Sequence, residues 1–221
     1  MNQRHIAVIG GTGPQGRGLA YRFALAGHQV TIGSRDVNRA REAAQEISDQ
    51  ASGSTLVSAA ENNEAARQAE IVLLAVPYAG HKELVLSLVE ELRDKIVISC
   101  VNPLGFDKSG PFALDVEDGS AAEEAAKLLP GSQIVGAFHH VAALSLWKTP
   151  EPLTHEDVLV CGDHEDANAV VADLASSVTG SSGLIVGGLR LARELEPWTA
   201  VLISINKRYK VRSGTHITGV Q

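Results

Sequence analysis

Residues 6–16 read Ile6-Ala7-Val8-Ile9-Gly10-Gly11-Thr12-Gly13-Pro14-Gln15-Gly16. The apolar start of this stretch is typical of a buried strand, and a helical pattern follows the glycines to about Ala26. Gly11, Gly13 and Gly16 fit the spacing G-x-G-x-x-G, which forms a dinucleotide site in a strand–turn–helix context. We expect these glycines to permit, in chain order, a tight turn, close approach of the backbone to a pyrophosphate, and close packing of the helix on the strand.

The second predicted strand, Gln29–Gly33, is followed by Ser34 and Arg35 instead of a carboxylate. An NAD enzyme usually carries Asp or Glu here for the ribose 2′-hydroxyl, whereas a hydroxyl and a guanidinium suit a 2′-phosphate. Arg35 and Arg39 could also be solvated surface charges, but cations near a helix N-terminus oppose the helix dipole. A bound anion would account for both arginines, so the pattern predicts NADP(H) as the cofactor.

Strands and helices alternate along the chain, which predicts an α/β protein with a Rossmann-type, doubly wound parallel sheet. The apolar run Ile71–Val76 is typical of a central parallel strand that is covered on both faces. Ligands of such sheets bind outside the carboxyl ends of the strands. At those ends we expect Thr12, Ser34, Val76, Pro77, Val101 and Asn102.

We predict two domains, a nucleotide-binding domain over residues 1–140 and a smaller C-terminal α/β lobe over residues 141–221 that closes the cleft. The first contains predicted helices at 37–50, 62–68, 80–93 and 120–129, and further strands at 55–57, 95–100 and 133–138. The second contains predicted strands at 157–161 and 183–186 and helices at 165–178 and 189–205. Residues 102–120 are rich in Gly and Pro, which indicates a long functional loop.

The composition is that of a folded protein with a sizeable core, with 221 residues, 44% hydrophobic and 20% charged. A formal net charge of −7 disfavours nucleic acid as a partner, because phosphate binding requires a basic face. Cys100 and Cys161 end apolar runs without metal-ligand spacing, so we expect buried free thiols in a reducing cytoplasm. Glycines interrupt the N-terminal apolar run and Pro77 the longest one, so we expect neither a signal peptide nor a membrane span.

Two adjacent histidines, His139 and His140, follow the strand predicted at 133–138. Successive side chains of an extended chain point to opposite sides, so both cannot ligate one metal ion, and no acidic or cysteine partner has a suitable spacing. We therefore expect no metal site. Either a histidine only ends the strand or packs between the lobes, or it takes part in a redox site.

The sequence contains no evident acid–base pair. Tyr78 and Lys82 have the YxxxK spacing of short-chain dehydrogenases, but they follow the fourth strand directly and the glycine loop lacks the spacing of that class. We expect Tyr78 to line the nicotinamide pocket or to pack on it. Hydride transfer between two planar cofactors mainly requires stacking, distance and orientation, so such a site can be largely apolar.

Five segments together resemble the NADPH:F420 oxidoreductase family, in order and over nearly the whole chain. They are Gly10–Leu19, Gly33–Arg35, Ala75–Tyr78, Ala137–Ala143 and Asp157–Asp163. The resemblance implies an oxidoreductase that transfers hydride reversibly between NADP(H) and the deazaflavin coenzyme F420. Two alternatives stay open, an NADPH-dependent reductase of another acceptor (flavin, quinone or ferric chelate) and a non-catalytic NADPH-sensing protein.

The resemblance also implies roles for individual residues. Thr12–Gln15 would hold the pyrophosphate, Ser34, Arg35 and Arg39 the 2′-phosphate, and Val76 with Ala137 the nicotinamide side. His139 and Val141 would border the deazaflavin ring at the hydride-transfer site, and the tail near Ser213 and Gly214 would close the pocket.

The chain departs from the family pattern in four places. One is His140-Val141-Ala142, which replaces a Thr-Ile-Pro sequence. In the other three, Pro14 replaces an Asn and removes one amide donor, Arg39 replaces a common lysine, and residues 206–221 match poorly. We expect a homodimer. We expect the helix at 189–205 to pack mainly in the core; a contact in the dimer is the alternative role for it.

Overall fold

The computed structural model describes residues 2–220, whose strands form one large sheet and one hairpin. The strands are β1 (His5–Ile9), β2 (Gln29–Ser34), β3 (Val57–Glu61), β4 (Ile71–Leu74), β5 (Ile96–Ser99), β6 (Leu104–Asp107), β7 (Gly110–Ala113), β8 (Gln133–Gly136), β9 (Leu159–Gly162) and β10 (Leu184–Gly187). The helices are α1 (Pro14–Leu25), α2 (Val37–Gln50), α3 (Asn62–Gln68), α4 (His81–Leu86), α5 (Val89–Leu92), α6 (Ala121–Leu128), α7 (Ala143–Lys148), α8 (Glu165–Thr179) and α9 (Ala192–Tyr209), with a short 3-10 helix η1 (Leu189–Leu191) before α9.

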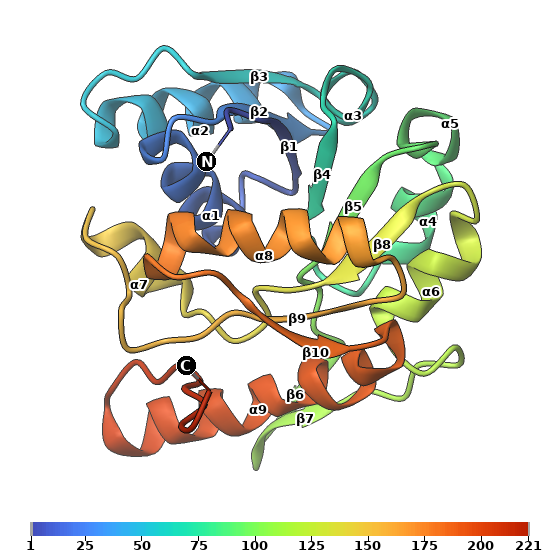
Figure 1. The fold of residues 1–221 in the computed structure, drawn as a ribbon, viewed down its shortest axis with the longest axis vertical. Helices are drawn as coiled ribbons and strands as arrows, with labels where there is room; N and C mark the ends of the chain where they lie inside the picture. Colours follow the sequence, from blue (N-terminus) through green and yellow to red (C-terminus); the bar gives the residue numbers. More distant parts are fainter. Residues whose placement is uncertain (1, 221) are drawn as a thin grey trace.

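The large sheet has the strand order β10-β9-β8-β5-β4-β1-β2-β3 and runs through the molecule (Figure 1). Neighbouring strands pair in parallel along the part of the sheet with the order β8-β5-β4-β1-β2-β3. The chain runs from β1 to β3 in one direction across the sheet, and from β4 to β8 in the other. This is the doubly wound arrangement, and the predicted Rossmann-type fold is confirmed. The crevice for ligands in such a sheet lies at the carboxyl ends of β1 and β4, where the order reverses.

Both faces of the sheet are buried at its central strands, as their continuous apolar sequences predict, whereas the edge strands β3 and β10 are partly exposed. In β1, Ile6 and Val8 belong to a cluster with the helices α1, α2 and α8, whereas Ala7 and Ile9 belong to a second cluster with α3 and α6. The side chains of a strand alternate between faces, so one strand supplies both layers. Each fully buried aliphatic side chain contributes about 1.5–3 kcal/mol to stability.

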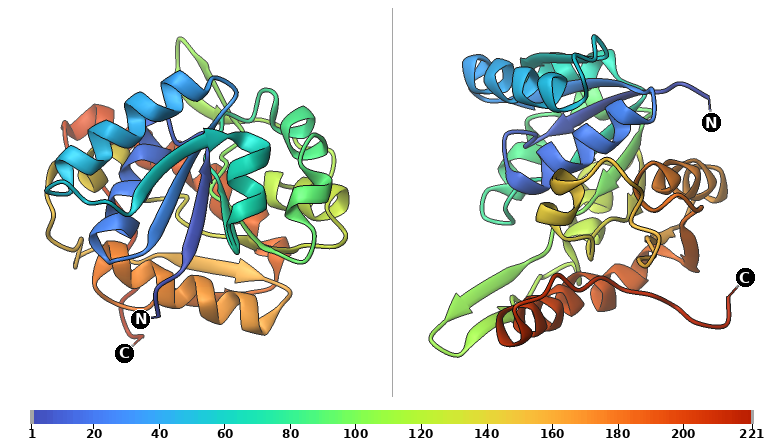
Figure 2. Two further views of the ribbon diagram at one scale, coloured as in Figure 1. Left: turned by 90° about the horizontal axis from the view of Figure 1, so that it is seen from above. Right: turned by 90° about the vertical axis from the view of Figure 1, so that its left-hand side faces the viewer.

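The chain after residue 140 extends the same sheet. Strand β9 pairs antiparallel with β8, through Val135 with Gly162 and Gly136 with Cys161, and β10 then pairs parallel with β9. Helix α9 follows and lies below the sheet in Figure 1, and the C-terminal tail returns beside it. The β6–β7 hairpin projects from the body next to α9 (Figure 2).

The structure differs locally from the sequence prediction. The loop expected at 102–120 contains the β6–β7 hairpin, and the single helix expected at 80–93 is two short helices, α4 and α5. Helix α7 was not predicted. Cys100 and Cys161 are buried and free, as expected, and burial raises the pKa of each thiol to about 12.

Candidate functional site

The glycine loop makes a sharp turn between β1 and α1. Gly10 has φ +82°, and a Cβ there would lie 2.5 Å from the carbonyl oxygen of Ala75, so the left-handed residue of the turn is Gly10, one position before the motif. A Cβ on Gly16 would lie 2.7 Å from the oxygen of Gly10. The first turn of α1 therefore packs directly on the loop, which only glycine at 16 permits.

The N-terminus of α1 is open to a ligand. Gly13 is the N-cap and supplies no side-chain cap, Pro14 follows at the first helical position, and the first turn has no acidic residue. A Cβ on Gly13 would contact only the oxygen of Gly10, at 3.4 Å. The uncapped N–H groups and the positive end of the helix dipole are suited to a pyrophosphate.

The predicted 2′-phosphate residues lie at the carboxyl end of β2, next to the glycine loop in the sheet. Ser34 is half-buried and its hydroxyl accepts a hydrogen bond from the N–H of Asp36 at 3.2 Å, while Arg35 and Arg39 are exposed. Within residues 2–220, neither arginine forms a salt bridge, although five other arginines do. Two guanidiniums without a carboxylate partner, one just before α2 and one in its first turn, form a site with the charge and donors for a phosphate.

The carboxyl ends of β4, β5 and β8 meet beside this loop. Val76 reaches the glycine loop, because a Cβ on Gly10 would lie 2.7 Å from its Cγ1. The N–H of Ala137 donates to the carbonyl of Ser99 at 3.1 Å, which places Ala137 beside the end of β5. Val101 is buried, Asn102 is half-buried, and Pro77 is exposed.

The segment 138–141 is held by three side chains from three separate elements. The Nε2 of Gln15 donates to the carbonyls of Phe138 (3.3 Å) and Val141 (3.2 Å). The carbonyl of His139 accepts from Asn102 Nδ2 (3.2 Å) and from Thr199 Oγ1 of α9 (3.1 Å). The side chain of Gln15, expected at the pyrophosphate, is therefore turned toward this segment, and its backbone N–H remains in the first turn of α1.

The two adjacent histidines differ in environment. Burial lowers the pKa of His139 to about 3, and neither of its ring nitrogens has a hydrogen-bond partner within the described chain. Burial also lowers the pKa of His140, whose Nε2 is 2.7 Å from the carbonyl oxygen of Leu195. Both imidazoles are thus neutral at physiological pH, and His140 is oriented by a backbone group of α9.

Tyr78 does not form a pair with Lys82. Its hydroxyl donates to Glu124 Oε2 at 3.3 Å, and the other carboxylate oxygen is 2.8 Å from His81 Nδ1. Burial and the Glu124 carboxylate raise the pKa of Tyr78, and Lys82 is exposed. Tyr78 therefore remains a neutral phenol that is fixed by α6.

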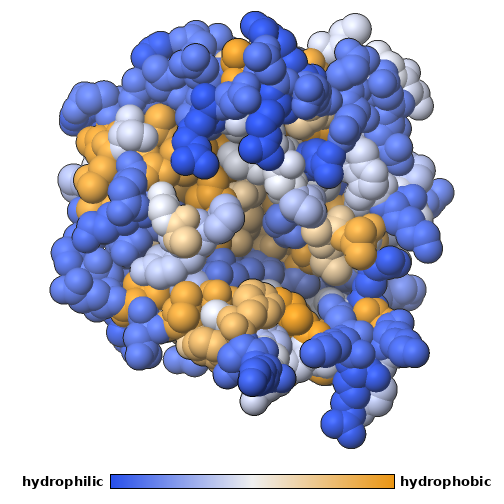
Figure 3. Space-filling view, turned by 180° about the vertical axis from the view of Figure 1, so that it is seen from behind, coloured by the Kyte–Doolittle hydropathy of each residue, from blue (hydrophilic) through white to orange (hydrophobic). Residues whose placement is uncertain are grey.

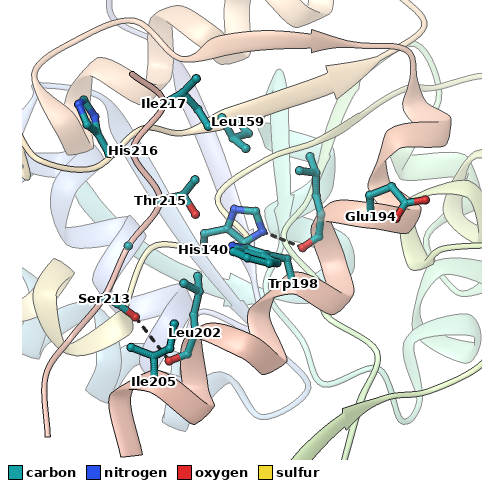
Figure 4. A pocket seen from close by; sticks show the side chains of 12 residues that line it. His140, Leu159, Glu194, Trp198, Leu202, Ile205, Ser213, Thr215, His216 and Ile217 are labelled. Atoms are coloured by element: carbon teal, nitrogen blue, oxygen red, sulfur yellow. Dashed lines mark hydrogen bonds between the residues drawn. The ribbon is translucent and has the colours of Figure 1, made fainter. Parts of the chain in front are cut away.

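A cavity of about 600 Å³ lies between α9 and the C-terminal tail. Trp198 and Leu202 lie on α9 at one side of it, Ser213 and Thr215 lie on the tail at the left, and His140 lies between them (Figure 4). Leu159 and Leu195 also line the cavity. Ser213 and Gly214, which were expected to close the pocket, both line this cavity. From the back of the molecule, a hollow crosses the middle, with apolar side chains along its lower edge (Figure 3).

Sequence reasoning missed the parts that depend on long-range contacts. The role of Thr199, the contact of His140 with Leu195 and the tethering role of Gln15 carry no local signal, since the partners are 55 to 126 residues away. No group of three or more His, Cys, Asp or Glu side chains suited to a metal ion occurs among residues 2–220. In the same range, no helix is long and apolar enough to cross a membrane.

Comparison with known proteins gives a match to one family model and matches to individual proteins over nearly the full chain. Residues 5–103 match the family model described as "NADP oxidoreductase coenzyme F420-dependent". The chain is 40% identical to the F420-dependent NADP reductase of Methanothermobacter thermautotrophicus, covering 97% of this chain and 95% of that protein. It is 38% identical to the F420-dependent NADP reductase of Methanocaldococcus jannaschii, covering 98% and 99%. A crystal structure from Arthrobacter sp. FB24, whose description suggests an F420-dependent NADP-reductase, superposes with a TM-score of 0.82 at 27% identity and covers 97% of this chain and 99% of that one.

Proposed function

The chain belongs to the family of F420-dependent NADP reductases, and on this premise we propose that it transfers hydride reversibly between NADP(H) and the deazaflavin coenzyme F420. One structural observation carries the proposal. Arg35 and Arg39 form no salt bridge within residues 2–220, and they follow β2, the strand that pairs with β1 beside the open N-terminus of α1. Together they fit the 2′-phosphate and the pyrophosphate of NADP(H) in the spacing of one βαβ unit.

We assign the nucleotide contacts as follows. The backbone of Gly11–Gly16 holds the pyrophosphate, including Thr12, Gly13, Pro14 and the N–H of Gln15, and Ser34, Arg35 and Arg39 hold the 2′-phosphate. Val76, Pro77, Val101, Asn102 and Ala137 surround the nicotinamide, because they lie at the ends of the central strands next to the glycine loop.

We place the acceptor on the far side of segment 138–141, bordered by His139, Val141 and the cavity that contains Ser213. Its volume of about 600 Å³ is within the range of sites for cofactor-sized ligands. In this assignment residues 1–140 bind the nucleotide, and residues 141–221 close the cleft over the acceptor.

The chemistry requires little from the protein beyond orientation. NADPH releases a hydride and becomes NADP⁺, and the deazaflavin accepts the hydride together with one proton from water. Each cofactor carries its own redox chemistry, so the protein supplies distance, stacking and exclusion of water. A neutral His139 is consistent with this role, since it places no cation near the developing positive charge of the nicotinamide.

We propose a cytoplasmic homodimer that does not bind nucleic acid. The net charge of −7 disfavours a polyanionic partner, and exposed apolar side chains on the hairpin and on α9, among them Phe106, Phe112 and Val201, offer a surface for a second copy.

The direct test mixes the purified protein with NADPH and oxidised F420 and follows the absorbance of both cofactors. We expect equimolar loss of NADPH and of oxidised F420, and the reverse with NADP⁺ and reduced F420. Reduction of flavin mononucleotide or a ferric chelate without reduction of F420 would favour the other-acceptor alternative. No transfer to any acceptor, with NADPH still bound, would favour a sensor.

The choice of nucleotide is tested with Ser34→Asp combined with Arg35→Ala. The 2′-phosphate loses a donor and a charged partner and faces a new carboxylate, so we expect the KM for NADPH to rise about 100-fold or more, with a much smaller change for NADH. Arg41→Ala is the matched control, because Arg41 lies nearby in α2 but bonds to Asn38. Equal effects on NADPH and NADH would contradict the 2′-phosphate assignment.

A further inference from the structure

The starting observation is that one side chain of the glycine loop bonds outside the loop. Gln15 is the second residue of α1, and its backbone N–H is among the donors available to the pyrophosphate. Its Nε2 donates to the carbonyls of Phe138 and Val141, at 3.3 and 3.2 Å. A primary amide nitrogen carries two hydrogens, and both are used here on carbonyls that can only accept.

The segment that Gln15 holds is strained and depends on outside donors for its shape. Phe138 is a buried non-glycine residue with φ +63°, a strained conformation that persists only where the surroundings enforce it. Its ring contacts Phe23 of α1, edge to face, with 5.8 Å between the centroids. Asn102 and Thr199 hold the next carbonyl, that of His139, from the other side.

We infer that Gln15 is a positioning residue that couples the pyrophosphate site to the acceptor-side segment 138–141, an inference that rests on the proposed function. A pyrophosphate bound at the N-terminus of α1 fixes the backbone of Gln15, and the two carboxamide bonds then fix segment 138–141. Coupling of this kind is reciprocal, so the nucleotide and the acceptor increase each other's affinity by the same factor. The same link sets the distance between the two rings, to which hydride transfer is sensitive.

The first experiment is independent of catalysis and measures amide hydrogen exchange of the full chain with and without NADP⁺. In the wild type we expect NADP⁺ to slow exchange in the glycine loop and also in residues 137–143. In Gln15→Met, which keeps the length of the side chain and the backbone N–H but removes both bonds, protection is expected in the glycine loop alone. Thr199→Val removes a bond to the same segment that does not involve the loop, and it should retain NADP⁺-linked protection of 137–143.

The second experiment measures hydride transfer to F420 with the same variants. For Gln15→Met we expect a Kd for NADP⁺ within about threefold of the wild type, a transfer rate at saturating NADPH lowered at least about 10-fold, and a raised KM for F420. Gln15→Glu should be worse than Gln15→Met, because a carboxylate cannot donate and would face two carbonyl oxygens. NADP⁺ should also cease to raise the affinity for F420 in both variants.

Two results would overturn the inference. One is protection of 137–143 by NADP⁺ that persists unchanged in Gln15→Met. The other is a Kd for NADP⁺ that rises in step with the loss of rate, which would make Gln15 a nucleotide ligand only. A wild type that shows NADP⁺-linked protection but does not reduce F420 would refute the proposed acceptor and still support the coupling, whereas no protection of the glycine loop would refute both.

Discussion

His139 is a buried imidazole whose two ring nitrogens have no partner within the described chain. A polar group in that position is costly unless it stays uncharged, and burial accordingly lowers its pKa to about 3. At the scale of the single residue, the fold thus keeps a neutral ring in the loop that follows β8. Any proton added to this ring must be accommodated without a hydrogen-bond acceptor beside it.

This burial predicts a pH dependence of stability. The pKa of His139 is lower in the folded protein than the usual 6.5 of an unfolded chain. The folded state therefore has its full stability with respect to this group above about pH 6.5, and it loses stability as the pH falls toward 3. Between pH 7.5 and 4.5 the wild type should lose roughly 2–3 kcal/mol through this group, a loss that His139→Leu should avoid. Urea unfolding at a series of pH values measures the difference, with the exposed His155→Gln as the control. Parallel pH profiles of the wild type and His139→Leu would contradict the argument.

At the scale of the element, α9 is fixed by a carboxylate at the N-terminus of α6. The two oxygens of Glu196 accept from the N–H groups of Ala121 (2.8 Å) and Ala122 (3.0 Å), and the residue is 1% exposed. Burial raises the pKa of Glu196 to about 7, while the two N–H donors favour the charged form. Three residues further along α9, Thr199 bonds to the carbonyl of His139, so the joint between α6 and α9 also positions the loop after β8.

Removal of this carboxylate should loosen α9. In Glu196→Ala two N–H groups lose their partner in a buried site, so we expect a loss of about 3 kcal/mol in the free energy of unfolding. Because α9 forms a wall of the cavity, the KM for F420 should rise more than the KM for NADPH. Glu194→Ala, an exposed residue of the same helix, is the control for unfolding and should change it by less than about 0.5 kcal/mol. A Glu196→Ala protein as stable as this control would show that the joint does not hold α9.

At the scale of the whole molecule, the sequence predicts what depends on local pattern and misses what depends on distant partners. The alternation of apolar runs and helices identifies the doubly wound sheet, and the glycine spacing together with Ser34–Arg35 locates the predicted nucleotide site. The β6–β7 hairpin is hidden because its strands have four residues each, one of them containing Pro111, and its support from α9 comes from far along the chain. Helix α7 has only six residues and no side-chain N-cap, so the sequence contains no residue that would indicate where this helix begins.

Buried Arg22 is the clearest of these distant links. It lies in α1 and is 1% exposed, and its guanidinium donates to four backbone carbonyls between residues 145 and 151, among them Leu146 (2.8 Å) and Glu151 (2.6 Å). No sequence pattern announces such a contact, since an arginine in a helix is usually solvated. The planar fork of donors ties the connection after α7 to the nucleotide-binding helix, and a lysine could not reproduce it.

Arg22→Met should therefore destabilise the whole molecule. The methionine fills much of the space but leaves buried carbonyls without donors, so we expect a loss of about 3 kcal/mol in the free energy of unfolding, with Arg22→Lys recovering only part of it. Urea denaturation should show one cooperative transition with an unchanged m value and a lower midpoint. Because Arg22 does not belong to the proposed nucleotide site, saturating NADP⁺ should raise the stability of both variants as much as that of the wild type. An Arg22→Lys protein as stable as the wild type would show that a positive charge alone is enough to hold these carbonyls. Failure of NADP⁺ to stabilise Arg22→Met would show that the connection after α7 belongs to the nucleotide site.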